Sequence, residues 1–218
     1  MDNKRISVST EPVKELDKLI TYIEKVKGVA DYIHFDIMDG EFVEQKTYSS
    51  EDVKVVKSCT NIPLDVHLMV KEPYKQIKNY IDAGANILTI HYEAFEDKSK
   101  LEKALKLIKD SKLLVGISIC PDTSVDMISS YLPMVDLVLV MSVIPGKSGQ
   151  KYLTSTNKKI KQLYEIRKKE NYNFFIQLDG GINVEVVQKL TKKHYDILVS
   201  GSYIYNSDDK ELAVKLIK

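Results

Sequence analysis

The segment HFDIMDG, residues 34–40, places a histidine and two aspartates inside an otherwise apolar run that begins at Tyr32. Ionisable side chains are costly to bury unless they are paired or bound to a metal ion. Either this segment is not a buried strand, or its polar residues serve a function at one end of a strand. The pattern of the remaining chain decides between these two interpretations.

Short apolar runs rich in β-branched residues recur along the chain, and each is followed by a longer amphipathic stretch. In VKELDKLITYIEKVKG (13–28), apolar residues recur at steps of three and four, as on one face of a helix. EPYKQIKNYIDAG (72–84) ends on a glycine placed like a helix C-cap. The expected strands are RISVST (5–10), YIHFDIM (32–38), PLDVHLMV (63–70), ILTIHYE (87–93), LLVGISI (113–119), LVLVMSV (137–143), FFIQLDG (174–180) and ILVSGSYI (197–204).

Alternation of strands and helices implies right-handed parallel crossovers, and nearly continuous apolar runs are typical of strands buried on both faces. A count of eight such units favours a closed (β/α)8 barrel, or TIM barrel, of the α/β class. An open sheet of six to eight strands is the alternative. No linker rich in Pro, Gly or Ser divides the chain, so we expect one catalytic domain over residues 1–218.

The composition is that of an ordinary globular protein, with 44% hydrophobic and 29% charged residues. A net charge of +1 gives no reason to expect nucleic acid or an anionic membrane as a partner. No apolar run approaches the ~18 residues of a membrane span, and the N-terminal segment lacks the apolar core of a signal peptide. The two cysteines have no metal-type spacing. We therefore expect a cytoplasmic protein.

Polar residues gather near the carboxyl ends of the expected strands, where the active sites of such barrels lie. Because side chains alternate along a strand, His34 and Asp36 face the same side, and His67 closes the next strand in the reversed spacing D-x-H. If both histidines point into the barrel mouth, Asp179 reaches over from the seventh strand. Two imidazoles and two carboxylates then converge, which predicts a site for one divalent metal ion: Zn²⁺, Fe²⁺, Mn²⁺ or Co²⁺. His91 is interpreted as a structural residue beside this site.

Glycines follow the last three expected strands, in MSVIPGKSGQKY (141–152), LDGGIN (178–183) and VSGSYIY (199–205). Backbone N–H groups at such turns bind phosphate oxygens, and the loops after strands seven and eight are the usual phosphate site of barrels. Gly180, Gly181, Gly201 and Ser202 therefore predict phosphate binding. Three methionines also lie at strand ends, either as core filling or as a dry lining beside the metal; they are Met38, Met69 and Met141.

A metal ion, two opposed carboxylates and a phosphate-binding site together indicate chemistry at a carbon next to a carbonyl. Removing a proton there builds negative charge on oxygen, and a metal that holds this oxygen and a neighbouring hydroxyl stabilises a cis-enediolate. Asp36 and Asp179, on opposite faces, would remove one proton and return another, which inverts the carbon. Their pKa values are expected to be split, with one carboxyl ionised and one protonated. Which of the two is protonated does not follow from the sequence.

The segments HFDIMDGEFV, LDVHLMV, LVMSVIPGKSGQKY, QLDGGIN and LVSGSYI together resemble the ribulose-phosphate 3-epimerase family over nearly the whole chain. The resemblance implies a ribulose-phosphate-binding barrel that converts D-ribulose 5-phosphate into D-xylulose 5-phosphate in the pentose phosphate pathway. It also implies a homo-oligomer, either a dimer or an assembly of dimers. The implied metal ligands are His34, Asp36, His67 and Asp179, with the two aspartates as acid and base. The implied substrate- and phosphate-binding residues are Ser9, His67, Gly146, Gly149, Gly180, Gly181, Gly201 and Ser202.

The chain departs from the family pattern in the loops that close over substrate. Glu44 and Gln45 replace a Pro-Asn pair, and Lys147 stands where an aromatic residue covers the substrate in the family. We expect the ammonium group of Lys147 to face solvent. A sister 3-epimerase acting on a hexulose phosphate, such as D-allulose 6-phosphate, is therefore an alternative, as is a catalytically idle phosphate-binding barrel. A related decarboxylase or synthase would carry a D-x-K-x-x-D motif, which no expected strand contains.

Overall fold

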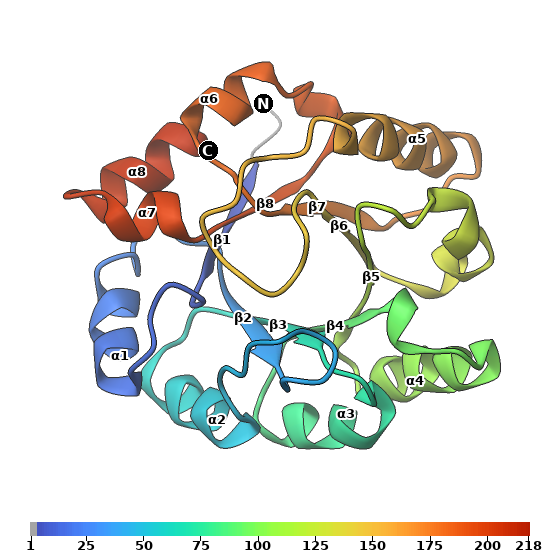
Figure 1. Ribbon diagram of the computed structural model, residues 1–218, viewed down its shortest axis with the longest axis horizontal. Coiled ribbons are helices and arrows are strands. Elements are labelled where there is room, and N and C mark those ends of the chain that lie inside the picture. Colours follow the sequence, from blue (N-terminus) through green and yellow to red (C-terminus); the bar gives the residue numbers. More distant parts are fainter. Residues whose placement is uncertain (1–3) are drawn as a thin grey trace.

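Eight parallel strands close into a barrel in chain order in the computed structural model, which describes residues 4–218 (Figure 1). The first strand pairs with both the second and the last, which completes the ring. The predicted barrel is therefore confirmed, and the open sheet is excluded. The strands are β1 (Arg5–Ser9), β2 (Tyr32–Met38), β3 (Leu64–Met69), β4 (Ile87–His91), β5 (Leu114–Ile119), β6 (Leu137–Met141), β7 (Phe175–Asp179) and β8 (Ile197–Ser200).

Helices surround the barrel on its outside (Figure 1). The α-helices are α1 (Leu16–Glu24), α2 (Ser50–Cys59), α3 (Pro73–Asp82), α4 (Lys98–Asp110), α5 (Thr156–Lys169), α6 (Val184–Lys189), α7 (Ser202–Asn206) and α8 (Lys210–Ile217). Within residues 4–218, three segments form 3₁₀ helices, namely η1 (Tyr92–Ala94), η2 (Val125–Met134) and η3 (Lys192–His194). The segment η2 takes the place of an α-helix between β5 and β6, and its Pro133 lacks the N–H that an α-helix needs.

The end of one helix and the end of one strand test the sequence patterns directly. The glycine expected after the third helix is Gly84, which has a φ of +92° and follows the helical C-cap Ala83. The last expected strand, residues 197–204, is wrong in its second half, because β8 ends at Ser200 and α7 begins at Ser202. The apolar Ile204 that suggested a longer strand is fully buried as a helix residue.

The barrel interior is divided into an apolar and a polar half. Six buried apolar residues form a cluster of their own, separate from the larger core: Ile87, Leu137, Leu139, Met141, Val143 and Ile197. Polar side chains of β1 to β5 and β7 are equally buried. Many of them hydrogen-bond to one another across the barrel, although the side chains of Thr89 and Ser118 make no hydrogen bond. Gln177 on β7, for example, donates through Nε2 to Asp65 Oδ2 on β3, at 2.6 Å.

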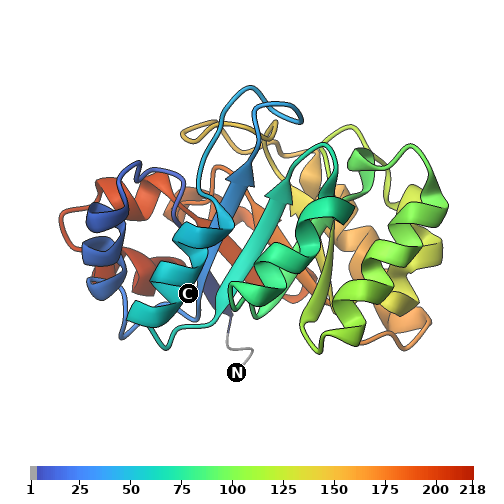
Figure 2. The ribbon, with the colours of Figure 1, turned by 90° about the horizontal axis from the view of Figure 1, so that it is seen from below.

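The carboxyl ends of the strands all lie at one end of the barrel, since every pair of neighbours is parallel. Figure 2 shows that the connection from β2 to α2, in blue, and the connection from β6 to α5, in gold, rise above the ring at that same end. No helix within residues 4–218 combines the length and apolar character needed to cross a membrane.

Candidate active site

The register of β2 against β3 sets the positions of the first polar side chains. His34 lies opposite Asp65, Asp36 opposite His67, and the two methionines at the strand ends lie opposite each other. Because alternate residues of a strand face the same side, both histidines and both aspartates of these two strands point into the barrel. The polar residues of the opening segment therefore form part of one buried cluster with those of the next strand.

The four predicted metal ligands converge at the carboxyl end of the barrel. Asp36 Oδ1 lies 3.3 Å from His34 Nε2 and 3.2 Å from His67 Nδ1. Asp179 Oδ2 on β7 lies 3.9 Å from each of the same two nitrogen atoms. One ligand atom from each of these four side chains lies within 4.8 Å of all the others.

This donor set fits a divalent cation on grounds of chemistry as well as distance. His34 Nε2 is buried and makes no hydrogen bond, although it faces the carboxylate oxygens of the cluster. A buried ring nitrogen without a hydrogen-bond partner is unfavourable unless another group binds it. Two imidazole nitrogens and two carboxylate oxygens suit Zn²⁺, Mn²⁺, Co²⁺ or Fe²⁺. The cluster can therefore hold a metal ion, and its ligands do not select one.

The remaining nitrogen atom of each histidine is held by a second polar side chain. His34 Nδ1 lies 2.7 Å from Asp65 Oδ2, and His67 Nε2 lies 2.9 Å from His91 Nε2. Such partners fix the orientation of a metal-ligating imidazole. The sequence did not assign a role to Asp65 and gave His91 a structural one. The available signal was the pattern of H-x-D in β2, D-x-H in β3 and H-x-E at the end of β4. The expected strand 87–93 is too long, because β4 ends at His91 and Glu93 lies in η1.

The two aspartates have pKa values that move in opposite directions. Burial would raise the pKa of Asp36, but the charges and hydrogen bonds of His34 and His67 outweigh burial and lower it. Burial and the nearby charge of Asp36 raise the pKa of Asp179 to about 8. In the protein alone, one carboxyl is therefore ionised at neutral pH and the other is protonated.

The two histidines differ in the same way. Burial lowers the pKa of His67 to about 4, even though its hydrogen bond to Asp36 acts in the opposite direction. For His34 the effect of burial is overcome by Asp65 and Asp36, which raise its pKa. A negative partner at each end of the His34 ring thus favours the protonated imidazole in the protein alone.

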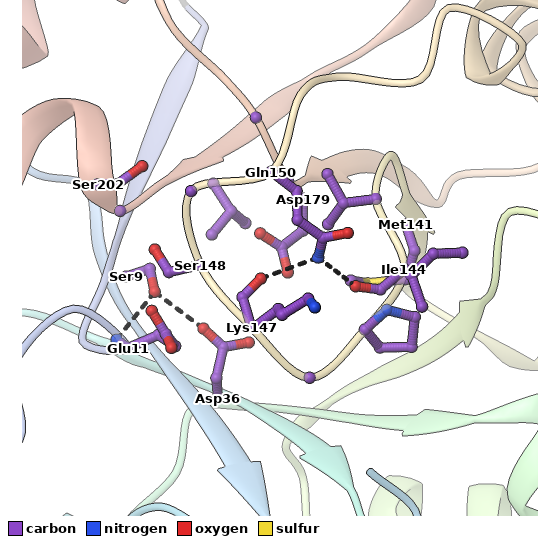
Figure 3. Close-up of a pocket in the computed structure, with 18 of the residues that line it drawn as sticks. Ser9, Glu11, Asp36, Met141, Ile144, Lys147, Ser148, Gln150, Asp179 and Ser202 are labelled. Atoms are coloured by element: carbon purple, nitrogen blue, oxygen red, sulfur yellow. Dashed lines mark hydrogen bonds between the residues drawn. The ribbon is translucent and has the colours of Figure 1, made fainter. Parts of the chain in front are cut away.

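Ser9, at the end of β1, orients the carboxylate of Asp36. Its hydroxyl donates to Asp36 Oδ2 at 2.8 Å and accepts from the backbone N–H of Glu11 at 3.1 Å (Figure 3). These contacts leave Asp36 Oδ1 facing the histidines and Oδ2 facing Ser9. Ser9, which the family resemblance implies as a site residue, therefore lies in contact with Asp36.

A pocket opens above the cluster, and the predicted site residues line it except His34 and His67, which are fully buried. Gly180 and Gly181 have φ values of +116° and +68°, in the region that favours glycine. A Cβ atom on Gly181 would lie 2.5 Å from the backbone nitrogen of Tyr152, so the turn leaves no space for a side chain. The predicted residues that line the pocket are Ser9, Asp36, Met38, Met69, Met141, Gly146, Gly149, Asp179, Gly180, Gly181, Gly201 and Ser202.

The loop between β6 and α5 borders the mouth of this pocket. The Gln150 side chain donates to the backbone oxygens of Ile144 and Lys147, at 2.6 and 2.9 Å, which holds the loop in a closed curve (Figure 3). The side chain of Lys147 is exposed and also lines the pocket. The ammonium group is therefore close enough to the mouth to meet an anionic ligand.

Comparison with solved structures gives the class of protein. The fold resembles 3-hexulose-6-phosphate synthase, with a TM-score of 0.72, 16% identity, and 98% of this chain and 97% of that one covered. It also resembles KGPDC from Streptococcus mutans in complex with D-R5P, with a TM-score of 0.75, 16% identity, and coverage of 98% and 95%. At such low identity the likeness shows the fold alone. The fold is therefore that of a TIM barrel.

Sequence comparison is more specific. Residues 5–205 match the ribulose-phosphate 3 epimerase family. The chain is 38% identical over 200 residues to ribulose-phosphate 3-epimerase of Treponema pallidum (strain Nichols), which covers 92% of this chain and 89% of the relative. It is also 38% identical over 193 residues to the enzyme of that name from Bacillus subtilis (strain 168), with 88% of each chain covered. The protein belongs to the ribulose-phosphate 3-epimerase family, and is therefore an isomerase.

Proposed function

We propose that the protein epimerises D-ribulose 5-phosphate at C3 to give D-xylulose 5-phosphate, with Asp36 and Asp179 as the two proton carriers. Family membership and the names of the relatives support the substrate. The observation that carries the mechanism is the split pair of carboxyls. Asp36 has a lowered pKa and Asp179 a raised one, around the same two histidine nitrogens.

The proton transfers follow from this pair. The ionised Asp36 removes the proton from C3, and the electron pair of the C–H bond moves toward the C2 carbonyl oxygen, which gives a cis-enediolate. The protonated Asp179 then delivers its proton to the opposite face of C3, the C2 carbonyl forms again, and the configuration is inverted. In the reverse reaction the two carboxyls exchange these tasks. Ser9 keeps Asp36 Oδ2 in place while the charge of the carboxylate changes.

The metal dependence is part of the same proposal. His34, Asp36, His67 and Asp179 would hold a divalent cation, which when bound supplies a Lewis acid for the negative charge that develops on the substrate oxygens. The surrounding methionines exclude water from this end of the barrel, since Met38, Met69 and Met141 are nearly fully buried beside the pocket. A dry site strengthens electrostatic interactions with the developing charge.

The phosphate group would bind at the glycine-lined side of the pocket. Gly146, Gly149, Gly180, Gly181, Gly201 and Ser202 offer backbone N–H groups there, and glycine allows a phosphate to approach the backbone closely. The fold neighbour that contains D-R5P is consistent with a sugar phosphate as ligand. Phosphate bound on this side would orient the sugar carbons toward the two aspartates.

An assay on two ketose phosphates tests the proposal. The purified protein, supplied with Zn²⁺, Mn²⁺, Co²⁺ or Fe²⁺ in turn, is incubated with D-ribulose 5-phosphate and with D-allulose 6-phosphate in deuterated water. We expect formation of the 3-epimer of ribulose 5-phosphate and incorporation of deuterium at C3. Preference for the hexulose phosphate would support the sister epimerase, and inertness toward both substrates with every metal would refute an epimerase.

Substitution of each aspartate tests the two-carboxyl mechanism separately. Asp36→Asn and Asp179→Asn each remove a proton carrier and a metal ligand, and we expect the rate to fall by several orders of magnitude. Near-normal turnover by either variant with metal present would refute the mechanism. A homo-oligomer and a cytoplasmic location stay predictions, and sedimentation of the purified protein tests the first of them.

A further inference from the structure

A line of hydrogen bonds leads away from His67 and ends in the loop after β5. His67 Nε2 faces His91 Nε2 at 2.9 Å, with the two rings stacked at 4.9 Å between centroids. His91 Nδ1 in turn faces Glu93 Oε2 at 2.9 Å. Glu93 Oε1 accepts from the backbone N–H of Cys120, at 2.7 Å, and from the hydroxyl of Thr123. His91 is fully buried, so water cannot replace any partner of its ring.

The far end of this line is fixed in place by a lysine of α5. Lys159 Nζ donates to the backbone oxygens of Cys120, Pro121 and Thr123, at 2.8, 2.6 and 2.5 Å. These contacts hold the loop so that the N–H of Cys120 points at Glu93. A backbone N–H can only donate, so the oxygen atom of Glu93 that faces it must accept.

These donors and acceptors determine where each proton lies. Glu93 is a carboxylate, because its hydrogen bonds from His91, Thr123 and Cys120 overcome burial and lower its pKa to about 2. A carboxylate accepts only, so neutral His91 carries its proton on Nδ1 and presents a lone pair at Nε2. The facing Nε2 of His67 must then carry the proton. In the protein alone, His67 Nδ1 faces the ionised Asp36 at 3.2 Å, and this carboxylate favours a proton on Nδ1. A metal ion bound to Asp36 would remove this competition, so with metal bound the lone pair of His67 lies on Nδ1, the atom that faces Asp36 and Asp179.

A second interpretation of the same residues is a metal site, because atoms of His91, Glu93 and Cys120 also lie within 4.8 Å of one another. A cation there would take the lone pair of His91 Nδ1 and place the proton on Nε2, opposite His67. Neutral His67 would then carry its own proton on Nδ1, which removes that atom from the first cluster. Burial raises the pKa of Cys120 to about 12, which further disfavours the thiolate that a metal requires.

We propose that Glu93 and His91 are positioning residues that fix the tautomer of His67, so that His67 Nδ1 offers its lone pair to the metal ion. This inference rests on the metal-binding role proposed above for His67. The backbone N–H of Cys120 has a fixed position. Through Glu93 and His91, it determines which nitrogen of His67 keeps a lone pair at the mouth of the barrel. Neither Glu93 nor His91 needs to touch the substrate for this effect.

Glu93→Gln is the informative variant, because the Cys120 N–H determines how the new amide lies. The amide oxygen must face that N–H, so the NH₂ group faces His91 Nδ1 and donates to it. The proton of His91 then moves to Nε2, and the proton of His67 moves to Nδ1. We expect metal affinity to fall by roughly 10- to 100-fold, measured by competition with a chromophoric chelator for Zn²⁺.

Asp196→Asn serves as a matched control. Asp196 is about as exposed as Glu93, at 26% against 23%, and it also accepts a backbone N–H, that of Ile176, at 2.7 Å. It belongs to the loop before β8, at the opposite end of the barrel. We expect this variant to lose stability without a change in Zn²⁺ affinity. Equal losses of affinity in both variants would refute a specific role for Glu93.

The tautomer itself can be read by a measurement that does not depend on activity. Two-bond ¹H–¹⁵N correlation spectra of the protein loaded with Zn²⁺ distinguish a protonated from an unprotonated ring nitrogen, and the chain has four histidines to assign. We expect His67 protonated on Nε2 in the wild type and on Nδ1 in Glu93→Gln. A wild-type His67 protonated on Nδ1 would overturn the inference, even if the variant fails to fold. Lack of activity with correct tautomers would instead refute the proposed function alone.

A double-mutant cycle with His91→Phe tests whether Glu93 acts through His91. Phenylalanine fills the ring position, beside Phe42 at 4.9 Å, but cannot pass on a hydrogen bond. We expect Glu93→Gln to have no further effect on Zn²⁺ affinity once His91 is replaced. Additive losses in the double variant would show that Glu93 acts by another route.

Discussion

The raised pKa of Asp179 predicts that Asp179→Asn becomes more stable relative to the wild type as pH rises, in protein stripped of metal by a chelator. Burial and the charge of Asp36 raise the pKa of Asp179 from 3.8 to about 8. Between these values the native state keeps a proton that the unfolded chain has lost, so native stability falls with rising pH. The fall is about 1.4 kcal/mol per pH unit. Asparagine has nearly the same size and cannot ionise, so it escapes this loss.

Denaturant unfolding at pH 5 and pH 8 measures the effect. Three pH units correspond to a relative gain of at most about 4 kcal/mol for the variant. Asp39→Asn is the control, because backbone hydrogen bonds outweigh partial burial and lower the pKa of Asp39. A lowered pKa changes stability only in acid, below the ordinary value, so the control should show no relative change between pH 5 and pH 8.

Two results would refute this reasoning about Asp179. The first is a stability difference between Asp179→Asn and wild type that stays constant from pH 5 to pH 8. The second is a variant whose stability relative to the wild type decreases at high pH. Adding metal should reduce the relative advantage of the variant, since a cation that binds only the native state adds about 2.7 kcal/mol at one hundred times its Kd. The variant, which lacks one ligand, should gain less.

Three further substitutions test the pocket. Ser9→Ala removes a hydrogen bond to the charged Asp36, worth about 1.5–3 kcal/mol, so kcat/KM should fall roughly tenfold or more; an unchanged value would mean that Asp36 is oriented without it. Gly181→Ala places a Cβ atom 2.5 Å from the nitrogen of Tyr152, and calorimetry should show a lower Tm, with a raised KM for the phosphate substrate. Lys147→Met should raise KM several-fold and leave kcat unchanged, because Lys147 lines the pocket; an unchanged KM would place its ammonium group in solvent.

The strands could be predicted from sequence because strands of a barrel are buried on both faces. That burial demands the nearly continuous apolar runs from which they were identified. Their ends were less well determined. In the segment 197–204 the apolar residues continue past Gly201, and hydrophobicity alone does not distinguish a strand from the short buried helix that follows. The loss of strand pairing after Ser200, which ends β8, depends on neighbours that the local sequence does not contain.

The site was partly predictable for a similar reason. Alternation along a strand brings His34 and Asp36 to one face, and the barrel rule places strand carboxyl ends together. The stagger between neighbouring strands was not available from sequence. It is this stagger that sets Asp65 opposite His34 and Asp36 opposite His67. Without the stagger, the sequence does not distinguish Asp65, which orients His34, from Asp36, which lies with His34 in the candidate metal site.

The division of the barrel interior explains how this chain tolerates such a cluster. The apolar half, with Leu137, Leu139 and Ile197, gains free energy from burial whether or not a metal is bound. The polar half is different, since His34 Nε2 has no hydrogen-bond partner and Asp179 is held away from its ordinary pKa. Both features disfavour the folded state of the protein alone, and both are relieved when a cation replaces the protons on His34 and Asp179 and binds the two side chains as ligands. The arrangement that weakens the fold is therefore the one that favours metal binding, and the wild type should gain more stability from a divalent cation than any variant in which the cluster has been made neutral.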